Sequence, residues 1–442
     1  MAACDRGAQG ARCRIAAAVA ALVGASALAA QQTGPGALRW LDDPNTPYRT
    51  ALSGEGVRTT LFGDPYELQP RDRRSVDTVT LGVADAMHAD EGTTPYGSLY
   101  LWRRPNDRSL LRAVLAGVYD EVLFTHGPFE HGDGSFELVG TFENWTPPWS
   151  SGELIDGEVA DGERLHWGYV RAGFGCGFRG QVGPENDNQL ASDLIVEPGL
   201  LYFGRADDTD PAFVVPDSTF ELRVRWQLRF DQLTRNLLDL PHRGYALGAD
   251  AVWGWRADSD AWGLPGTEFH SGDEGRDYVQ ATGYVFAIGD LPFVASERWR
   301  LFGSAHGGAG SGVDRFSAQR VGGGPDLRGQ EFGTTARPLL PGAAIGEFFP
   351  EHYAIGSVGV RSELTWFAFL DAGVTVARLD RDRDEAGTRQ RGDDTFVAIA
   401  ARLASGFFGN FRLQIDYAYD FDVVRSGDFG GHELVVQMSK HF

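Results

Sequence analysis

One stretch of this sequence alternates apolar and polar residues without exception: Phe220-Glu221-Leu222-Arg223-Val224-Arg225-Trp226-Gln227-Leu228-Arg229-Phe230-Asp231. The alternation returns at 411–417, Phe-Arg-Leu-Gln-Ile-Asp-Tyr. A period of two residues is that of a β-strand with one apolar face and one charged face. A soluble β-sandwich also contains such strands, but about 11 residues is the length at which a tilted strand crosses a bilayer. Because the chain also ends on an aromatic residue, Phe442, the pattern predicts a transmembrane antiparallel β-barrel.

The amino end has the features of a secretory signal peptide, which we predict to span 1–30. Three arginines precede an apolar run at 15–28, and small residues come just before Gln31. The alternative, a transmembrane anchor, is disfavoured because the apolar run is only about 14 residues long. Cleavage would leave Cys176 as the one cysteine, so no intramolecular disulfide is expected. No later run is apolar enough for a membrane helix, so any crossing must use strands in a closed sheet.

The charge balance disfavours a nucleic-acid partner. The chain has 61 acidic and 40 basic residues, a net charge of −21. Acids concentrate at 207–210 and 380–385, which we interpret as solvated outer loops rather than calcium sites. A second possible metal cluster, His126, Glu130, His131 and Asp133, is interpreted as a polar loop. We therefore expect no metal and no cofactor.

The strand pattern begins near Val76 and predicts about 16 strands, an even number as in bacterial barrels. Fifteen are assigned, and one more is expected in the ambiguous region 150–163; the fifteen are 77–88, 96–103, 109–119, 135–144, 164–178, 190–204, 218–231, 243–256, 276–289, 297–308, 352–364, 366–379, 394–404, 410–421 and 432–442. Counted backwards from the carboxyl end, longer and shorter connections alternate, as expected for extracellular loops and periplasmic turns. Both termini are then periplasmic in a bacterial outer membrane. Residues 76–442 form the predicted barrel, and 31–75 a periplasmic or luminal segment too short for an accessory domain.

The longest connection, 309–351, has the composition of a structured segment. It contains Val321-Gly322-Gly323-Gly324-Pro325-Asp326-Leu327-Arg328-Gly329-Gln330. The glycines and the proline permit a tight irregular path. Arg328 has five donors in a rigid fork, which suits an anchor to carboxylates on the inner wall of the barrel. We therefore predict that this loop enters the lumen.

These residues resemble the BamA/TamA superfamily of outer-membrane barrels, also described as the bacterial surface antigen domain. The pair Gly322-Gly323 followed by Arg328-Gly329 is similar to the sixth extracellular loop of that family. Two further elements resemble its strand motifs in the same order, and five strands follow the loop, as in the family. Those elements are Asp239-Leu240-Pro241-His242-Arg243-Gly244, with Pro241 and Gly244, and Phe369-Leu370-Asp371-Ala372-Gly373, with Phe369, Asp371 and Gly373.

The resemblance implies a contact between Arg328 and Asp371 inside the lumen. The sequence agrees on direction, since Leu370, Ala372 and Val374 form one apolar face and leave Asp371 on the other. A second carboxylate partner of the arginine would be Glu363, at an unusual spacing. The chain departs from the family in having Gln330 where an aromatic residue usually follows Arg-Gly, and in having no room for periplasmic POTRA domains.

The last strand carries a predicted assembly signal. Its lipid-facing side is formed by Leu434, Val436, Met438 and Phe442. Lys440 interrupts this side, at a position where its long stem can reach the membrane interface. In the family such a carboxyl end doubles as the signal for insertion.

The function implied by the resemblance is outer-membrane protein assembly or translocation, by a divergent or accessory member without POTRA repeats. Its partners would be outer-membrane lipids and unfolded outer-membrane protein clients or a periplasmic protein. The alternative is a passive pore or a structural barrel. An outer-membrane hydrolase comes third: Ser304 and His306 share a strand face, but the sequence has no G-x-S-x-G element and no clear third member. We expect the protein not to be an enzyme.

Overall fold

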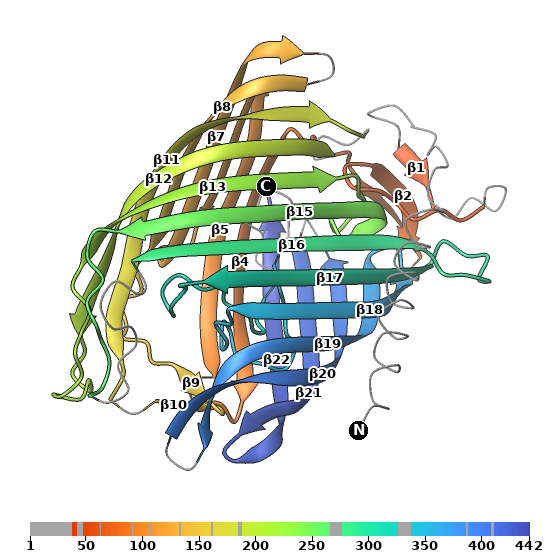
Figure 1. Ribbon diagram of the computed structural model, residues 1–442. Helices are drawn as coiled ribbons and strands as arrows, with labels where there is room; N and C mark the ends of the chain where they lie inside the picture. Colours follow the sequence, from red (N-terminus) through yellow and green to blue (C-terminus); the bar gives the residue numbers. More distant parts are fainter. Residues whose placement is uncertain are drawn as a thin grey trace, which may run out of the picture.

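The chain forms a closed antiparallel β-barrel, seen from the side in Figure 1. The computed structural model describes residues 38–41, 47–61, 63–90, 92–106, 108–131, 134–160, 162–183, 188–265, 276–325, 337–385, 388–407 and 411–442. The predicted signal peptide lies outside these ranges. In the described part of the chain no helix is long and apolar enough to cross a membrane.

Sixteen long strands build the barrel in the described residues, as predicted. They are β4 (Ser75–Met87), β5 (Thr93–Asn106), β6 (Ser109–Leu115), β7 (Tyr119–His131), β8 (Gly134–Trp145), β11 (Leu165–Gln181), β12 (Gln189–Arg205), β13 (Thr219–Asp231), β15 (Pro241–Arg256), β16 (Asp277–Asp290), β17 (Trp299–Ser311), β18 (His352–Thr365), β19 (Ala368–Glu385), β20 (Thr388–Phe407), β21 (Phe411–Arg425) and β22 (Asp428–His441). The two-residue β14 (Thr234–Arg235) adds to β15 at one end.

The last strand closes the barrel by pairing with the first. The register between β22 and β4 runs without interruption from His441 opposite Thr78 to His432 opposite Met87. The amide of Phe442 continues it by donating to the carbonyl of Asp77 at 3.0 Å. We call the end where β4 begins and β22 ends the terminal rim. The other end, where β19–β20 and β21–β22 turn, is the hairpin rim.

Side chains alternate between lipid and lumen as the sequence predicted. In β13, Phe220 is 46% exposed and its neighbour Glu221 is 1% exposed. In β19, Leu370 is exposed and Asp371 is buried. Because apolar residues cover the outside, the charged faces of these strands meet in the lumen. The same alternation holds in β22, where Met438 is exposed and points outward.

Three strand assignments from the sequence were wrong. The sixteenth strand is β7, while 150–163 contains only the short hairpin of β9 (Leu154–Ile155) and β10 (Glu158–Val159). His126 and His131 therefore belong to a strand rather than a polar loop. The predicted loops at 380–393 and 422–431 are largely strand hairpins, and the second turns at Ser426 and Gly427, whose φ angles are 50° and 85°.

The segment before the barrel forms a small sheet beside the terminal rim. Strands β1 (Leu38–Trp40), β2 (Gly56–Leu61) and β3 (Asp64–Leu68) pair in that order, with β1 and β2 parallel. Figure 1 shows β1 and β2 at the right-hand end of the barrel. The connecting residues 47–55, which we call the strap, lie at the mouth of the barrel there, where Thr50 and Ala51 are buried.

The alternation of connections predicts which rim faces the cell exterior. Cysteines introduced at Asp260 and Gly427, both exposed at the hairpin rim, should react with a membrane-impermeant thiol reagent on intact cells. A cysteine at Ser296, exposed at the terminal rim, should react only after the outer membrane is permeabilised. The Cys176→Ala background removes the native thiol. The opposite labelling pattern would mean that the barrel has the reverse orientation in the membrane.

The carboxyl end predicts an insertion defect. Phe442 is 68% exposed on the outside of the barrel while its amide continues the seam. Deleting Phe442 should lower the amount of folded barrel in the outer membrane, measured by heat-modifiable migration in electrophoresis. Deletion of the exposed Phe429 side chain by Phe429→Ala, at the hairpin rim, is the matched control and should leave that amount unchanged. Equal losses in both would refute a specific role for the terminal residue.

Candidate functional site

The long connection between β17 and β18, which we call the loop at 312–351, crosses the lumen in its described parts, 312–325 and 337–351. At one side Phe316 packs on Trp167 of β11 and Phe203 of β12, with ring centroids 5.1 and 4.7 Å apart. At the other side the loop forms an apolar cluster with inward residues of β18–β21. The cluster comprises Val321, Leu340, Ala343, Phe348, Tyr353, Ile355, Ala377, Leu379, Phe396 and Val423. Since β11 and β21 lie in different walls of the barrel, the loop spans the space between them.

Two buried ion pairs anchor this loop to the wall. Asp314 accepts two hydrogen bonds from Arg256 of β15, at 2.6 and 3.1 Å. Glu347 accepts two from Arg425 of β21, both at 2.7 Å. All four side chains are at most 6% exposed. Bidentate pairs of this kind are geometrically specific, and losing one partner leaves a buried charge that costs about 3–5 kcal/mol.

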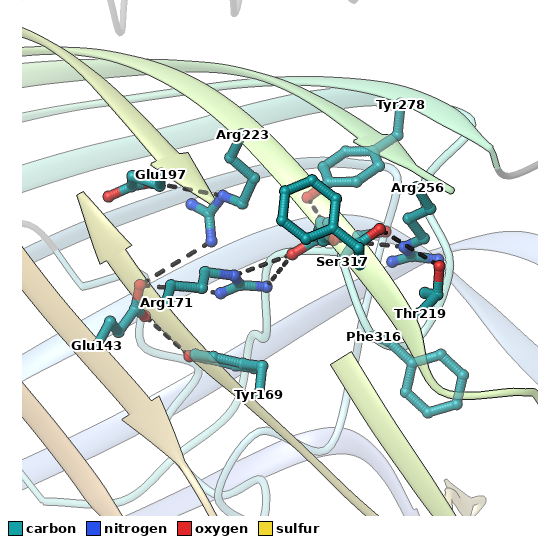
Figure 2. Close-up of polar contacts among 12 residues, drawn as sticks. Glu143, Tyr169, Arg171, Glu197, Thr219, Arg223, Arg256, Tyr278, Phe316 and Ser317 are labelled. Carbon is teal, nitrogen blue, oxygen red and sulfur yellow. Dashed lines mark hydrogen bonds and ion pairs between the residues drawn. The ribbon is translucent and has the colours of Figure 1, made fainter. Parts of the chain in front are cut away.

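The Asp314 anchor belongs to a network of alternating charges, and Figure 2 shows the surroundings of its members Glu143, Arg171 and Arg256. Glu221 lies between Arg256 and Arg171, at 3.3 and 2.7 Å, and also accepts from the Tyr278 hydroxyl at 3.0 Å. The network continues from Arg171 to Glu143 at 3.8 Å. It therefore connects the loop with inward side chains from β8 to β16.

Glycines bring the loop backbone onto β22. The amides of Gly324 and Gly342 both donate to the carboxylate of Glu433, the second at 3.0 Å. A Cβ on Gly322 would lie 2.2 Å from the carbonyl oxygen of Ala344, and one on Gly323 would lie 2.3 Å from that of Ala343. Both glycines are thus required by close backbone approach, which is the tight path that the sequence indicated.

Asp371 has a partner that the sequence did not suggest. Arg361, on the neighbouring strand β18, donates to both carboxylate oxygens of Asp371 at 2.7 Å. The same guanidinium donates to the carbonyl of Pro241. Arg328 and Gly329 lie outside the described residues, so the contact between Arg328 and Asp371 stays a prediction. Both carboxylate oxygens of Asp371 already accept hydrogen bonds from Arg361.

The two strand motifs meet through this arginine at the terminal rim. Phe369 is 2% exposed and packs against Leu238 and Leu240 of the turn between β13 and β15. Gly244 has a φ of +110°, and a Cβ there would lie 2.2 Å from the carbonyl of Gln232. A Cβ on Gly373 would lie 2.9 Å from the carbonyl of Val358. Turn 232–240 is therefore folded back into the barrel mouth.

Glu363, the expected second partner of Arg328, faces the strap instead. It accepts hydrogen bonds from the hydroxyls of Tyr48 and Thr50 and is 5% exposed. No sequence pattern connects these residues, which are more than 300 positions apart. The contact places the strap inside the terminal rim.

The β9–β10 hairpin at the hairpin rim is a further element whose contacts the sequence did not indicate. The β9–β10 hairpin reaches the loop through Glu153 and Arg315, at 3.3 Å, and reaches the β19–β20 hairpin through Asp156 and Arg381, at 2.5 Å. Burial and the nearby charge of Arg315 lower the pKa of Arg320 in the same loop to about 10, so it is cationic at neutral pH. Its guanidinium lies 5.5 Å from the ring of Trp167.

A cavity of about 350 Å³ lies within the lumen, between the loop and the terminal rim. Its lining includes Ser304 and His306 of β17 together with Asp371 and Arg361. His306 stacks on Tyr284, with ring centroids 5.9 Å apart. In the part of the chain that the structure describes, no hydrogen bond joins Ser304 to His306, so the geometry gives no nucleophile and base.

One cluster has the residue types of a metal site. Potential ligand atoms of Glu351, His352 and Asp380 lie within 4.8 Å of one another at the hairpin rim. However, Asp380 already accepts from Arg391 at 2.5 Å and from the amide of His352 at 2.6 Å. A guanidinium therefore occupies the position that a cation would take.

Comparison with known proteins identifies the fold. No protein-family model and no curated protein sequence matches the chain. Among solved structures, BamA from Haemophilus ducreyi lacking POTRA domains 1–3 matches with a TM-score of 0.50 and 12% identity, over 88% of this chain and 75% of that one. The chain has the fold of a BamA outer-membrane barrel. CdiB from Acinetobacter baumannii is also similar, with a TM-score of 0.45 and 9% identity over 88% of this chain and 66% of that one.

Arg361 and Arg328 are two candidate partners of Asp371 in this BamA-type barrel, and double-mutant cycles distinguish between them. Arg361→Ala and Asp371→Ala should each destabilise the barrel, and the double variant should be less than additive by about 1–3 kcal/mol, since the two residues are in contact. Thermal unfolding in detergent measures this coupling. The same cycle with Arg328→Ala tests the resemblance. Coupling of Asp371 to Arg328 alone would show that the contact with Arg361 is unimportant, and coupling to both would make the site a three-membered lock.

Proposed function

We propose that this chain is an outer-membrane barrel of the assembly or translocation type, whose lumen is closed in the resting state. The observation that carries the proposal is the loop at 312–351, anchored to two walls of a BamA-type barrel. The described parts of this loop, 312–325 and 337–351, pack against both walls and so fill part of the lumen. The outward face of the barrel, covered by exposed residues such as Leu81, Val358 and Ile399, suits contact with lipids.

The same observation weighs against the alternative of a passive pore. A porin-type channel keeps a polar, water-filled lumen open. Here apolar side chains such as Leu340 and Phe348, fully or almost fully buried, fill the lumen near the hairpin rim. Turn 232–240 and the strap fill it near the terminal rim. A divergent assembly barrel, acting on unfolded outer-membrane proteins or with a periplasmic partner, fits a closed resting state better.

Reconstitution in liposomes tests this proposal. The purified barrel should accelerate the folding of a small outer-membrane barrel added from urea, while planar bilayers show little steady conductance. Arg256→Ala removes one loop anchor and should raise conductance, because the buried Asp314 loses its partner. Arg378→Ala, which breaks an exposed pair with Asp393, is the matched control and should change neither readout.

The two functions give opposite results in this experiment. Steady conductance of the unaltered protein without any effect on the client would overturn the proposal and favour the pore. Client folding equal to that in liposomes containing an unrelated barrel would also count against it.

A further inference from the structure

We propose that the strap, residues 47–55, is a gate at the terminal rim that closes the luminal cavity and moves away to open it. The proposal concerns a different end of the barrel from the loop at 312–351. It does not depend on the proposed function, because a gate would serve a pore and an assembly barrel alike.

The strap is held to turn 232–240 by a short piece of sheet. Leu52 and Asn236 form an antiparallel bridge. The amide of Ser53 donates to the carbonyl of Arg235 at 2.9 Å. The amide of Leu237 donates to the carbonyl of Ala51 at 3.2 Å. These two backbone hydrogen bonds hold the strap against the turn, and the pairing does not extend into a longer strand.

Carboxylates from three separate barrel elements complete the attachment. Asp239 of the turn accepts from the hydroxyl of Ser53 in the strap, and also from Arg71, which follows β3, at 2.8 and 3.0 Å. Glu297, between β16 and β17, accepts from the amide of Thr50 at 3.2 Å. Glu363, at the end of β18, accepts the hydroxyls of Tyr48 and Thr50. The strap therefore bridges places on the rim that the barrel strands hold apart.

The position of the strap makes it a cover for the cavity. Turn residues Asp239, Leu240 and Pro241 line the cavity, as do Arg73 and Val76, which follow the strap in the chain. The strap packs on the same turn at the mouth of the barrel, where Thr50 and Ala51 are 0% and 1% exposed. The strap therefore lies against the turn that forms part of the cavity wall at the terminal rim.

The chemistry of its contacts makes the strap the closure that moves most easily. The loop at 312–351 is fixed by a ten-member apolar cluster, whereas the strap is fixed mainly by hydrogen bonds to carboxylates. Water can replace such hydrogen bonds when the strap leaves, so the net cost of opening is small compared with exposing an apolar core. The strap runs directly into β2, and the small sheet of β2 and β3 connects it to β4, so it can move while the chain stays attached to the barrel.

Labelling of a cavity cysteine tests the gate. The reporter is Ser304→Cys in a Cys176→Ala background, and the readout is its rate of reaction with a hydrophilic maleimide in detergent. The release variant, Glu363→Gln with Asp239→Asn, weakens the carboxylate contacts and should raise the rate by about tenfold or more. The matched control is Glu67→Gln, because Glu67 pairs with Arg58 and Gln69 within the small sheet. This control should label at the original rate.

Trypsin cleavage shows separately whether the strap has moved. In the release variant Arg49 should become cleavable while the barrel keeps its heat-modifiable migration. Cleavage at Arg49 with an unchanged labelling rate would overturn the proposal, because the strap would then be attached without closing anything. If Arg49 stays protected, a second variant with the signal sequence joined directly to Val76 removes the strap altogether. Slow labelling in that folded variant would equally overturn the gate, and fast labelling would support it.

Discussion

A sheet that crosses a membrane can have no free edge, because lipid offers no partner for an unpaired backbone amide or carbonyl. The uninterrupted pairing of β22 with β4 meets this requirement. Closure then fixes everything inside, since side chains alternate strictly between lipid and lumen once the sheet is a barrel. Charged strand side chains such as Glu221, Arg171 and Arg256 are directed to the same interior, where they must find partners.

The lumen is accordingly built from paired charges rather than from an apolar core alone. Glu221 lies between two arginines, and each of these has a further acidic neighbour. A wall arginine at the edge of such a network needs an acid from elsewhere, and the loop at 312–351 supplies it with Asp314 and Glu347. The loop is held in the lumen because the wall would otherwise contain uncompensated buried charge, which is far more costly than an exposed one. Loop and wall thus depend on each other.

The sequence was sufficient for the barrel because the signal comes from period-two alternation, which each membrane-spanning strand must show. It failed where that signal is interrupted. In β7 two adjacent acids, Asp120 and Glu121, and the pair Gly127-Pro128 at a bulge break the alternation, so the strand resembled a loop. The hairpin of β19 and β20 leaves the membrane with charged residues on both faces, so its outer part has no apolar face to detect. The backbone pairing between β19 and β20 continues this hairpin beyond the membrane-spanning part.

The site was predictable only in part, for a related reason. Gly322 and Gly323 could be predicted, because close backbone approach excludes any side chain and leaves a trace in the sequence. The carboxylates Glu347, Glu363 and Glu433 could not, because nothing in their own neighbourhoods indicates which distant backbone amide or hydroxyl they accept from. Asp371 and Pro241, which come from the two strand motifs, are connected by Arg361, which belongs to neither motif.

Arg361 shows how the two ends of the lumen are coordinated. Its guanidinium ties Asp371 of β19 to the carbonyl of Pro241, at the end of turn 232–240. The strap contacts that turn through Ser53 and Asp239, and contacts β18 through Glu363, two residues beyond Arg361. A shift of β18 relative to β19 would therefore disturb the floor of the cavity and the strap together. The loop at 312–351 is continuous with the other end of β18, so this one strand carries contacts to the strap at one rim and leads into the loop at the other.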